Sequence, residues 1–418
     1  MRGAAVLCEN ARFCAGGKRR GLYAVLRSPN KQETHQMNAL FYMRDGRLFR
    51  FADGASAPVS CGAVEQYMEN LKQIHRKKEW KTQGTGAGFM GVWQEEIDLS
   101  DIRPADAVCT PDGRLVYGAV LQQGGAVQRK NPDAPDEAEG LLLRHADCTI
   151  HDMACDAEGK RLALSLSGSG WGERNIALMP LDANRFRFIT EGECRDSNPA
   201  FDPDNSDILY YDSCGLAHTE RGLVFGPRAV NRLNLAEGTL DTVLSDDKHD
   251  YFQPRPDGAG GLYCIRRPYR AGHQGGSGLR DLALAPFKIS KALFGWLDFF
   301  TQRYGGEPLK TSGANPAKAK QQSEEERFIE GNLVKVRQNK KADPADRHPA
   351  AIPDDWELVR TTADGSQTVL LRGVMAYTPA PDGGVIYSNG RAILRRSPEG
   401  AVSLITEARW AEKLRLQP

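Results

Sequence analysis

The sequence lacks the short motifs by which many hydrolases and nucleotide-binding proteins are recognised. It contains no G-x-S-x-G nucleophile turn, no H-E-x-x-H zinc site and no Walker loop. These absences exclude a serine peptidase of the prolyl oligopeptidase kind with its hydrolase domain attached. We therefore assign no catalytic residue from motifs.

The chain also has little excess charge and few cysteines. Its 55 Lys and Arg residues balance 54 Asp and Glu residues, so we expect no nucleic-acid partner. The nine cysteines are odd in number and scattered, which indicates reduced thiols and no zinc site. The apolar run at the N-terminus is short and is broken by Glu9, so we expect no signal peptide and a cytoplasmic location.

What the sequence does contain is one turn that recurs along the chain. Its acidic residue stands at positions 112, 158 and 204, a spacing of 46 both times. A period of this size predicts a repeat architecture. The copies are Pro111-Asp112-Gly113, Ala157-Glu158-Gly159, Pro203-Asp204-Asn205, Pro256-Asp257-Gly258 and Pro381-Asp382-Gly383.

Short apolar runs flank each copy, such as Ala107–Cys109 before the first turn and Leu115–Tyr117 after it. Runs of this length bounded by Pro, Asp and Gly are typical of strands joined by a hairpin. A second hairpin usually follows, and four short strands per period make one propeller blade. We predict an all-β, six-bladed β-propeller, with five or seven blades as the alternatives. The expected blades lie at about 36–60, 104–148, 150–192, 196–246, 250–372 and 374–406.

The order of these segments resembles the TolB-type, WD-like β-propeller over roughly residues 100–265 and 350–406. The order is an apolar run, Pro-Asp-Gly, a second apolar run and then a strand ending in Asp-Gly. One six-bladed ring with its insertions accounts for the length of the chain, so we expect a single propeller domain over 1–418. Such propellers act as binding platforms, as peptidase gates and in some cases as enzymes, so the resemblance implies a fold more than an activity. They also occur beside AAA ATPases in bacterial gene sets, which implies a partner from such a system.

A closed propeller needs a strand to seal its seam, because a sealed ring has no exposed sheet edge. Tyr23–Leu26 and Ala401–Ile405 are both strand-like. We expect these two segments at the seam.

Two insertions interrupt the period, at 61–92 and at 270–352. In the first, Val64, Tyr67 and Leu71 have helical spacing, and a glycine-rich stretch follows. The second combines flexible segments with an amphipathic helix at about 282–304. Its proposed docking residues share one apolar region: Leu293, Phe294, Trp296, Leu297 and Phe300.

Three roles compete for the helix at 282–304. It packs on the propeller, docks a partner protein, or lies on a membrane surface. Lys288, Lys291 and Asp298 interrupt it and count against a membrane span. We favour packing or a protein partner.

Counting six residues back from the acidic residue of each turn gives the positions where the inner strands face the channel: Asp106, Asp152, Asn198, Tyr251 and Ala376. Four further polar residues lie near them in the sequence: His151, Asp196, His249 and Asp250. The predicted channel-mouth residues are Asp106, His151, Asp152, Asp196, Asn198, His249, Asp250 and Tyr251. Such a ring is able to bind a divalent cation or a polar ligand. Alternatively, its aspartates cap backbone amides of the neighbouring blade.

Two functions follow as hypotheses. The first is a non-catalytic interaction module, or scaffold, in a bacterial-type cytoplasmic complex, with protein partners and no cofactor. The alternative is a channel-centred enzyme, lyase- or hydrolase-like and metal-dependent, acting on a small polar or carbohydrate substrate.

Overall fold

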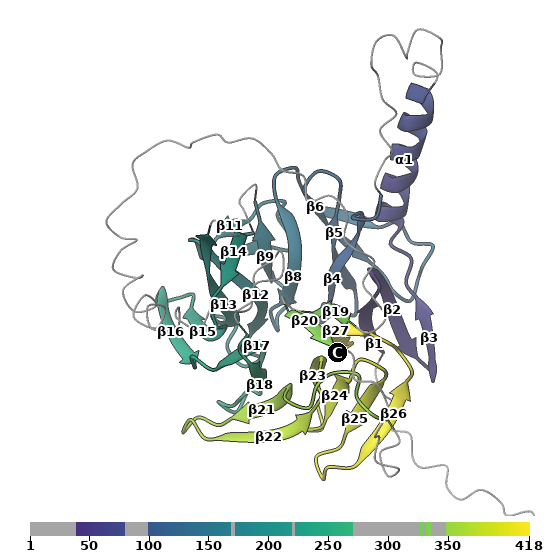
Figure 1. The fold of residues 1–418 in the computed structure, drawn as a ribbon. Coiled ribbons are helices and arrows are strands. Elements are labelled where there is room, and N and C mark those ends of the chain that lie inside the picture. The colour runs from purple at the N-terminus through teal and green to yellow at the C-terminus, as the bar shows by residue number, and fades with distance from the viewer. Residues whose placement is uncertain are drawn as a thin grey trace, which may run out of the picture. The chain divides into compact units, whose positions relative to one another are not determined.

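The computed structural model describes residues 39–79, 99–168, 172–219, 222–270, 326–329, 332–335 and 348–418. Within these ranges, antiparallel strands form six blades around a centre (Figure 1). The innermost strands contact one another in the order β4, β8, β12, β17, β23, β27 and back to β4. This closed circuit confirms the prediction of a six-bladed β-propeller.

The first three blades come from the N-terminal half of the described chain, apart from one strand, β27, from its C-terminal end. Blade 1 contains β27 (Glu412–Leu416), β1 (Leu40–Arg44), β2 (Arg47–Ala52) and β3 (Ala55–Pro58). Blade 2 contains β4 (Arg103–Cys109), β5 (Leu115–Val120), β6 (Gly125–Lys130) and β7 (Gly140–His145). Blade 3 contains β8 (Thr149–Cys155), β9 (Arg161–Ser167), β10 (Asn175–Pro180) and β11 (Arg187–Phe188).

The last three blades follow in chain order. Blade 4 contains β12 (Cys194–Phe201), β13 (Ile208–Thr219), β15 (Ala229–Asn234) and β16 (Thr239–Leu244), with β14 (Gly222–Phe225) paired to β13. Blade 5 contains β17 (His249–Pro256), β18 (Leu262–Pro268), β21 (Glu357–Thr361) and β22 (Gln367–Arg372). Blade 6 contains β23 (Ala376–Pro379), β24 (Val385–Ser388), β25 (Ile393–Arg396) and β26 (Val402–Thr406).

The recurring turns form hairpins through the chemistry of their own residues. Asp156 accepts backbone hydrogen bonds from Lys160 (2.8 Å) and Arg161 (3.1 Å), and so closes the second turn. Gly113 has a φ of 77°, which other residues rarely adopt. Local side-chain and backbone bonds therefore set the phase of each blade.

Ring closure differs from the prediction. The closing strand is β27, which pairs with β1 through Leu416 opposite Leu40 and Arg415 opposite Phe41. The segment Ala401–Ile405, expected at the seam, instead belongs to β26 on the outside of blade 6, so that prediction is wrong. The pattern of a strand does not say whether it is inner or outer, whereas burial does. Most of β26 is exposed and Leu414 of β27 is buried. Tyr23–Leu26 lies outside the described residues.

The blades pack face to face through apolar side chains, as between Phe252, Trp356 and Tyr377 of blades 5 and 6. Some contacts leave no room for a side chain. A Cβ on Gly118 of β5 would lie 2.7 Å from Ile150 Cγ2 in the next blade. Close packing of this kind holds the inner strands at a defined spacing around the channel.

The first insertion begins with α1 (Gly62–Glu79). Val64 is buried against blades 1 and 2, with Tyr67 and Leu71 packed beside it. The carboxylate of Glu139 accepts the first helical amides, those of Gly62 and Ala63, at 3.0 Å each. The rest of this insertion, residues 80–92, lies outside the described residues, as does the helix predicted at 282–304 with its docking residues.

Two short strands, β19 (Glu326–Ile329) and β20 (Asn332–Lys335), pair with each other in a separate sheet. No helix in the described ranges has the length and apolar character that a membrane crossing requires.

Candidate functional site

The inner strands share one register, which shows which residues are equivalent. Asp106, Asp152, Asn198 and Gln253 each stand four residues before the residue whose amide closes the turn. Asn198, Gln253 and Lys413 also share a positive φ, of 51°, 55° and 54°, at a β-bulge. Lys413 of the closing strand therefore occupies the same place in blade 1.

This register moves one predicted residue out of the channel set. Asp257 is the first residue of its turn, whereas Asp112 is the third residue of the turn that Thr110 opens. Counting back from Asp257 therefore reaches Tyr251, two residues before the equivalent Gln253. Tyr251 lies in an apolar cluster with Val230, Leu244 and Cys264.

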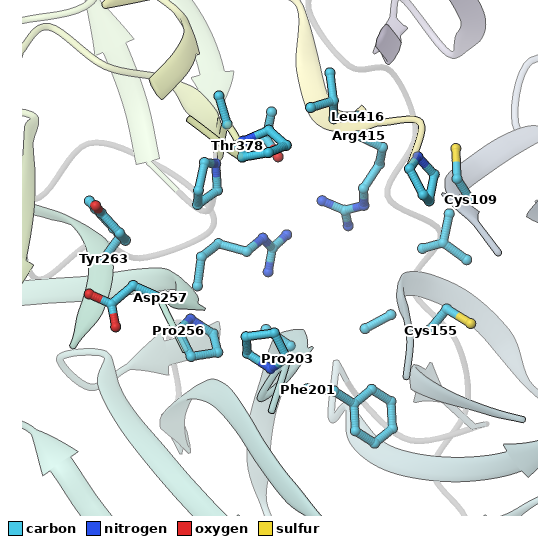
Figure 2. A pocket seen from close by; sticks show the side chains of 18 of the residues that line it. Cys109, Cys155, Phe201, Pro203, Pro256, Asp257, Tyr263, Thr378, Arg415 and Leu416 are labelled. Carbon is cyan, nitrogen blue, oxygen red and sulfur yellow. The ribbon is translucent and has the colours of Figure 1, made fainter. Parts of the chain in front are cut away.

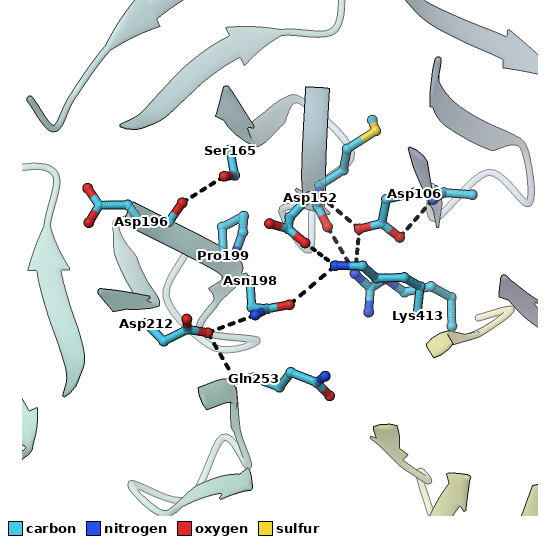
Figure 3. Close-up of polar contacts among 12 residues, drawn as sticks. Asp106, Asp152, Ser165, Asp196, Asn198, Pro199, Asp212, Gln253 and Lys413 are labelled. Atoms are coloured by element: carbon cyan, nitrogen blue, oxygen red, sulfur yellow. Dashed lines mark hydrogen bonds and ion pairs between the residues drawn. The ribbon is translucent and has the colours of Figure 1, made fainter. Parts of the chain in front are cut away.

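A polar chain crosses the centre of the ring (Figure 3). The Lys413 ammonium donates to Asp152 and, at 3.4 Å, to Asn198 Oδ1. Asn198 Nδ2 donates to Asp212 Oδ2 at 2.8 Å, and the backbone amide of Gln253 donates to the same oxygen at 3.0 Å. This network joins blades 1, 3, 4 and 5, and its members Asp152, Asn198 and Asp212 are almost fully buried.

Asp106 acts as a cap between blades. Its carboxylate accepts the amides of Ala107 at 2.8 Å and of Met153, in blade 3, at 2.9 Å. Arg415 of the closing strand donates to it at 2.9 Å and to the Met153 carbonyl at 3.2 Å. For Asp106 the structure therefore shows the capping role that the sequence left as an alternative.

The two remaining predicted aspartates also bind structural partners. Asp250 accepts the Arg228 amide at 3.0 Å and Arg267 Nε at 3.0 Å. Asp196 accepts the Thr190 hydroxyl at 2.6 Å, and burial raises the pKa of its carboxyl. Burial is the largest single influence on the pKa of Asp152 as well. At Asp152, however, the nearby cations, Lys413 first among them, outweigh burial and lower the pKa.

The two predicted histidines do not meet. His151 Nε2 lies 2.7 Å from Ser167 Oγ, and burial, with Arg174 adding to it, lowers the pKa of the imidazole to about 3. His249 Nδ1 instead lies 2.5 Å from Asp246 Oδ2, in the loop before β17. Among the described residues, no three His, Cys, Asp or Glu side chains are placed to hold one metal ion.

A cavity of about 590 Å³ lies where the inner strands end (Figure 2). All six inner strands contribute to it. One register position supplies a side chain from each: Val108, Ala154, Ala200, Arg255, Thr378 and Arg415. The first three are small and apolar, so the two arginines dominate the polarity of this layer.

The two arginines differ in their partners. Arg415 is bound to Asp106, as described above. Arg255 Nη1 donates to the carbonyls of Pro254 at 2.9 Å and Pro199 at 3.5 Å, and it forms no ion pair with a carboxylate among the described residues. Burial, and then the charge of Arg415, lower the pKa of the Arg255 guanidinium to about 10, so it remains a cation at neutral pH.

The sequence reasoning missed Lys413, Arg415, Asp212 and Arg255. Arg255 could have been found from the sequence. When the copies are aligned on the first residue of each turn, an arginine stands at 255 where the other copies have a smaller residue. Lys413 and Arg415 follow the last turn copy, and Asp212 lies on a second strand. No repeat position pointed to them.

No protein-family model matches the sequence, and a comparison with curated proteins finds no match. Solved structures do match. A protein described as TolB from Agrobacterium tumefaciens is 14% identical over 55% of this chain and 66% of its own, with a TM-score of 0.37. This chain thus spans just under two thirds of that protein.

Two further matches differ in kind. A structure of a nidogen/laminin complex is 7% identical over 91% of this chain and 98% of its own, with a TM-score of 0.46. An oligogalacturonate lyase from Vibrio parahaemolyticus is 10% identical over 73% and 79%, with a TM-score of 0.36. These likenesses concern the fold alone. The six-bladed propeller predicted from the turns is the fold that the six sheets form.

Proposed function

We propose that this chain is a non-catalytic β-propeller interaction module that binds a partner protein at its central cavity. One observation carries the proposal: all six inner strands contribute to an open cavity of about 590 Å³ on the ring axis. Clefts of about 300–1,000 Å³ are the usual size of ligand sites. The rim includes Phe201, Tyr263 and several prolines, which suits a partner with apolar side chains.

The channel carboxylates support a structural role over a catalytic one. Asp106, Asp212 and Asp250 each accept a backbone amide and a guanidinium. A carboxylate that holds both has few lone pairs left for a proton or a metal ion. We infer that this acidic set maintains the ring.

A single feature favours the alternative, a channel-centred enzyme. Asp152 Oδ2 is buried and has no hydrogen-bond partner among the described residues. Titration calorimetry with Mn²⁺ tests this alternative. Mn²⁺ binding that disappears in Asp152→Asn would favour the metal-dependent enzyme. If the wild-type protein gives no heat of binding, this alternative is excluded.

The proposal also names the setting of the module. We place it in the cytoplasm, in a bacterial-type complex, and the seven described cysteines, all free thiols, support that placement. An AAA ATPase-containing system remains the partner suggested by family resemblance. The helix predicted at 282–304 remains a second hypothetical docking element.

Site-specific photo-crosslinking in cells tests the module. Benzoylphenylalanine replaces Tyr263 on the cavity rim or, as the control, Leu240, which is 46% exposed on the outer strand β16. We expect one protein adduct at position 263 that is absent at 240. Identical adducts at both positions, or none at 263, would contradict the proposal. A variant lacking 282–304 shows whether that segment contributes to the same adduct.

A further inference from the structure

We infer that the central cavity binds a carboxylate carried by a peptide segment of the partner, with Arg255 as its main ligand and Arg415 beside it. This inference rests on the proposed function for the existence of a partner. The chemistry of the site rests on the contacts around the two arginines.

Arg255 provides a partly buried cation that forms no ion pair with a carboxylate among the described residues. Buried charges in proteins are normally paired, because desolvation is costly when no counter-charge is present. Asp257, the one Asp or Glu residue that lines the cavity, is held by Arg360 at 2.6 and 3.1 Å and by the amides of its own turn. Arg255 is therefore able to bind a carboxylate that belongs to another molecule.

The two guanidiniums are held in place before any ligand arrives. Arg415 is fixed by Asp106 and by the Met153 carbonyl, and Figure 2 shows it directed into the cavity. One nitrogen of Arg255 is fixed by two carbonyls, which leaves its remaining donors for a ligand. Guanidinium groups that are preorganised in this way bind planar carboxylates with two parallel hydrogen bonds.

The walls indicate what accompanies the carboxylate. Val108, Ala154 and Ala200 leave space at the level of the arginines, and Phe201, Pro203 and Pro379 line the cavity as well. A free phosphate or citrate ion would leave these apolar surfaces without a partner. A peptide that carries Asp or Glu next to apolar residues matches both parts of the cavity.

Selection from a random-peptide phage library tests the assignment on the full chain, as wild type and as Arg255→Met. Arg187→Met, which removes an exposed arginine from β11, is the matched control. We expect wild type and control to enrich peptides with Asp or Glu beside apolar residues, and Arg255→Met to lose this preference. For one selected peptide, Arg255→Met and Glu→Gln in the peptide should each weaken binding roughly tenfold or more. Combining both changes should add little.

Arg255→Lys separates charge from geometry. It should retain part of the affinity, because a lysine keeps the charge without the planar pair of donors. Unchanged urea unfolding of Arg255→Met excludes misfolding as the cause of its loss of binding.

The remaining outcomes contradict the inference in distinguishable ways. Peptides that bind wild type and Arg255→Met equally would overturn the carboxylate assignment and leave the interaction module in place. Binding of inorganic phosphate or citrate that depends on Arg255, with no peptide enriched, would assign the site to a free anion. Failure of the cross-linking at position 263 would instead remove the module itself.

Discussion

Lys413, on the strand that closes the ring, donates its ammonium to the carboxylate of Asp152 in blade 3, across 261 residues of sequence. Their side chains are 14% and 3% exposed. The closing strand is therefore held twice, by pairing with β1 at the seam and by an ion pair at the centre of the channel.

Removing one partner of this pair should destabilise the whole ring. Lys413→Met leaves Asp152 buried without its cation, and we expect the free energy of unfolding to fall by roughly 3–5 kcal/mol. Urea unfolding followed by tryptophan fluorescence measures the loss. Asp152→Asn in the Lys413→Met background should restore part of it. If the double variant is as unstable as the sum of the single variants, the two residues are not coupled.

Arg255 and Arg415 occupy equivalent positions, yet their replacement should have opposite consequences. Arg415→Met deprives Asp106 of its cation and should cost roughly 3 kcal/mol. Arg255→Met removes a partly buried cation that has no acidic ion-pair partner among the described residues, so the free energy of unfolding should stay the same or rise, as is common at binding sites. Urea unfolding of both variants checks this. A large loss of stability in Arg255→Met would mean that Arg255 is structural.

His151 should make the protein sensitive to mild acid. The pKa of its imidazole falls from an unfolded value of 6.5 to about 3 in the folded protein. A lowered pKa contributes stability that is present above pH 6.5 and is lost as the pH falls toward 3, by at most about 1.4 kcal/mol per pH unit for one proton. His151→Gln should lose less stability between pH 7 and pH 4.5 than wild type.

Ser167→Ala is the control for this measurement. It removes the hydrogen-bond partner of His151 but keeps the titrating ring. Its pH dependence should resemble that of wild type. Equal slopes for wild type and His151→Gln would contradict the assignment.

Asp196 should show the opposite dependence on pH. Burial raises the pKa of its carboxyl. The stability that it contributes is therefore present below the unfolded pKa of about 3.9 and is lost as the pH rises through the folded value. Asp196→Asn keeps an acceptor for the Thr190 hydroxyl and should gain stability relative to wild type between pH 4 and pH 8. A relative loss over this range would show that the carboxylate is favourable when charged.

Close packing between blades 2 and 3 provides a test of the ring itself. Gly118→Ala places a methyl group 2.7 Å from Ile150 Cγ2 and 2.9 Å from Met153 Sδ. We expect a loss of roughly 1–3 kcal/mol from overpacking, measured by urea unfolding. Gly215→Ala is the control, because its Cβ would meet nothing within 4 Å. Equal effects of the two changes would mean that backbone freedom of glycine, and not packing, decides the result.

The recurring turns predicted the number and the limits of the blades because their chemistry is local. Asp156, for example, bonds only to the next few residues, so a single sequence carries the whole signal. The same locality explains an error. The turn of blade 5 begins at its acidic residue, two residues later than in the other copies, so the count reaches Tyr251 and misses Gln253. The predicted aspartates lie on the inner strands as expected, but their partners were not visible in the sequence.

The sequence by itself determined the strand pattern, the turns and therefore the type of ring. Only the tertiary structure decided which strand closes the ring and which cations bind the channel aspartates. It also decided that Arg255 forms no ion pair with these aspartates. The reason is physical: a hairpin forms between neighbours in the chain, whereas the bond from Lys413 to Asp152 exists only after six blades have closed.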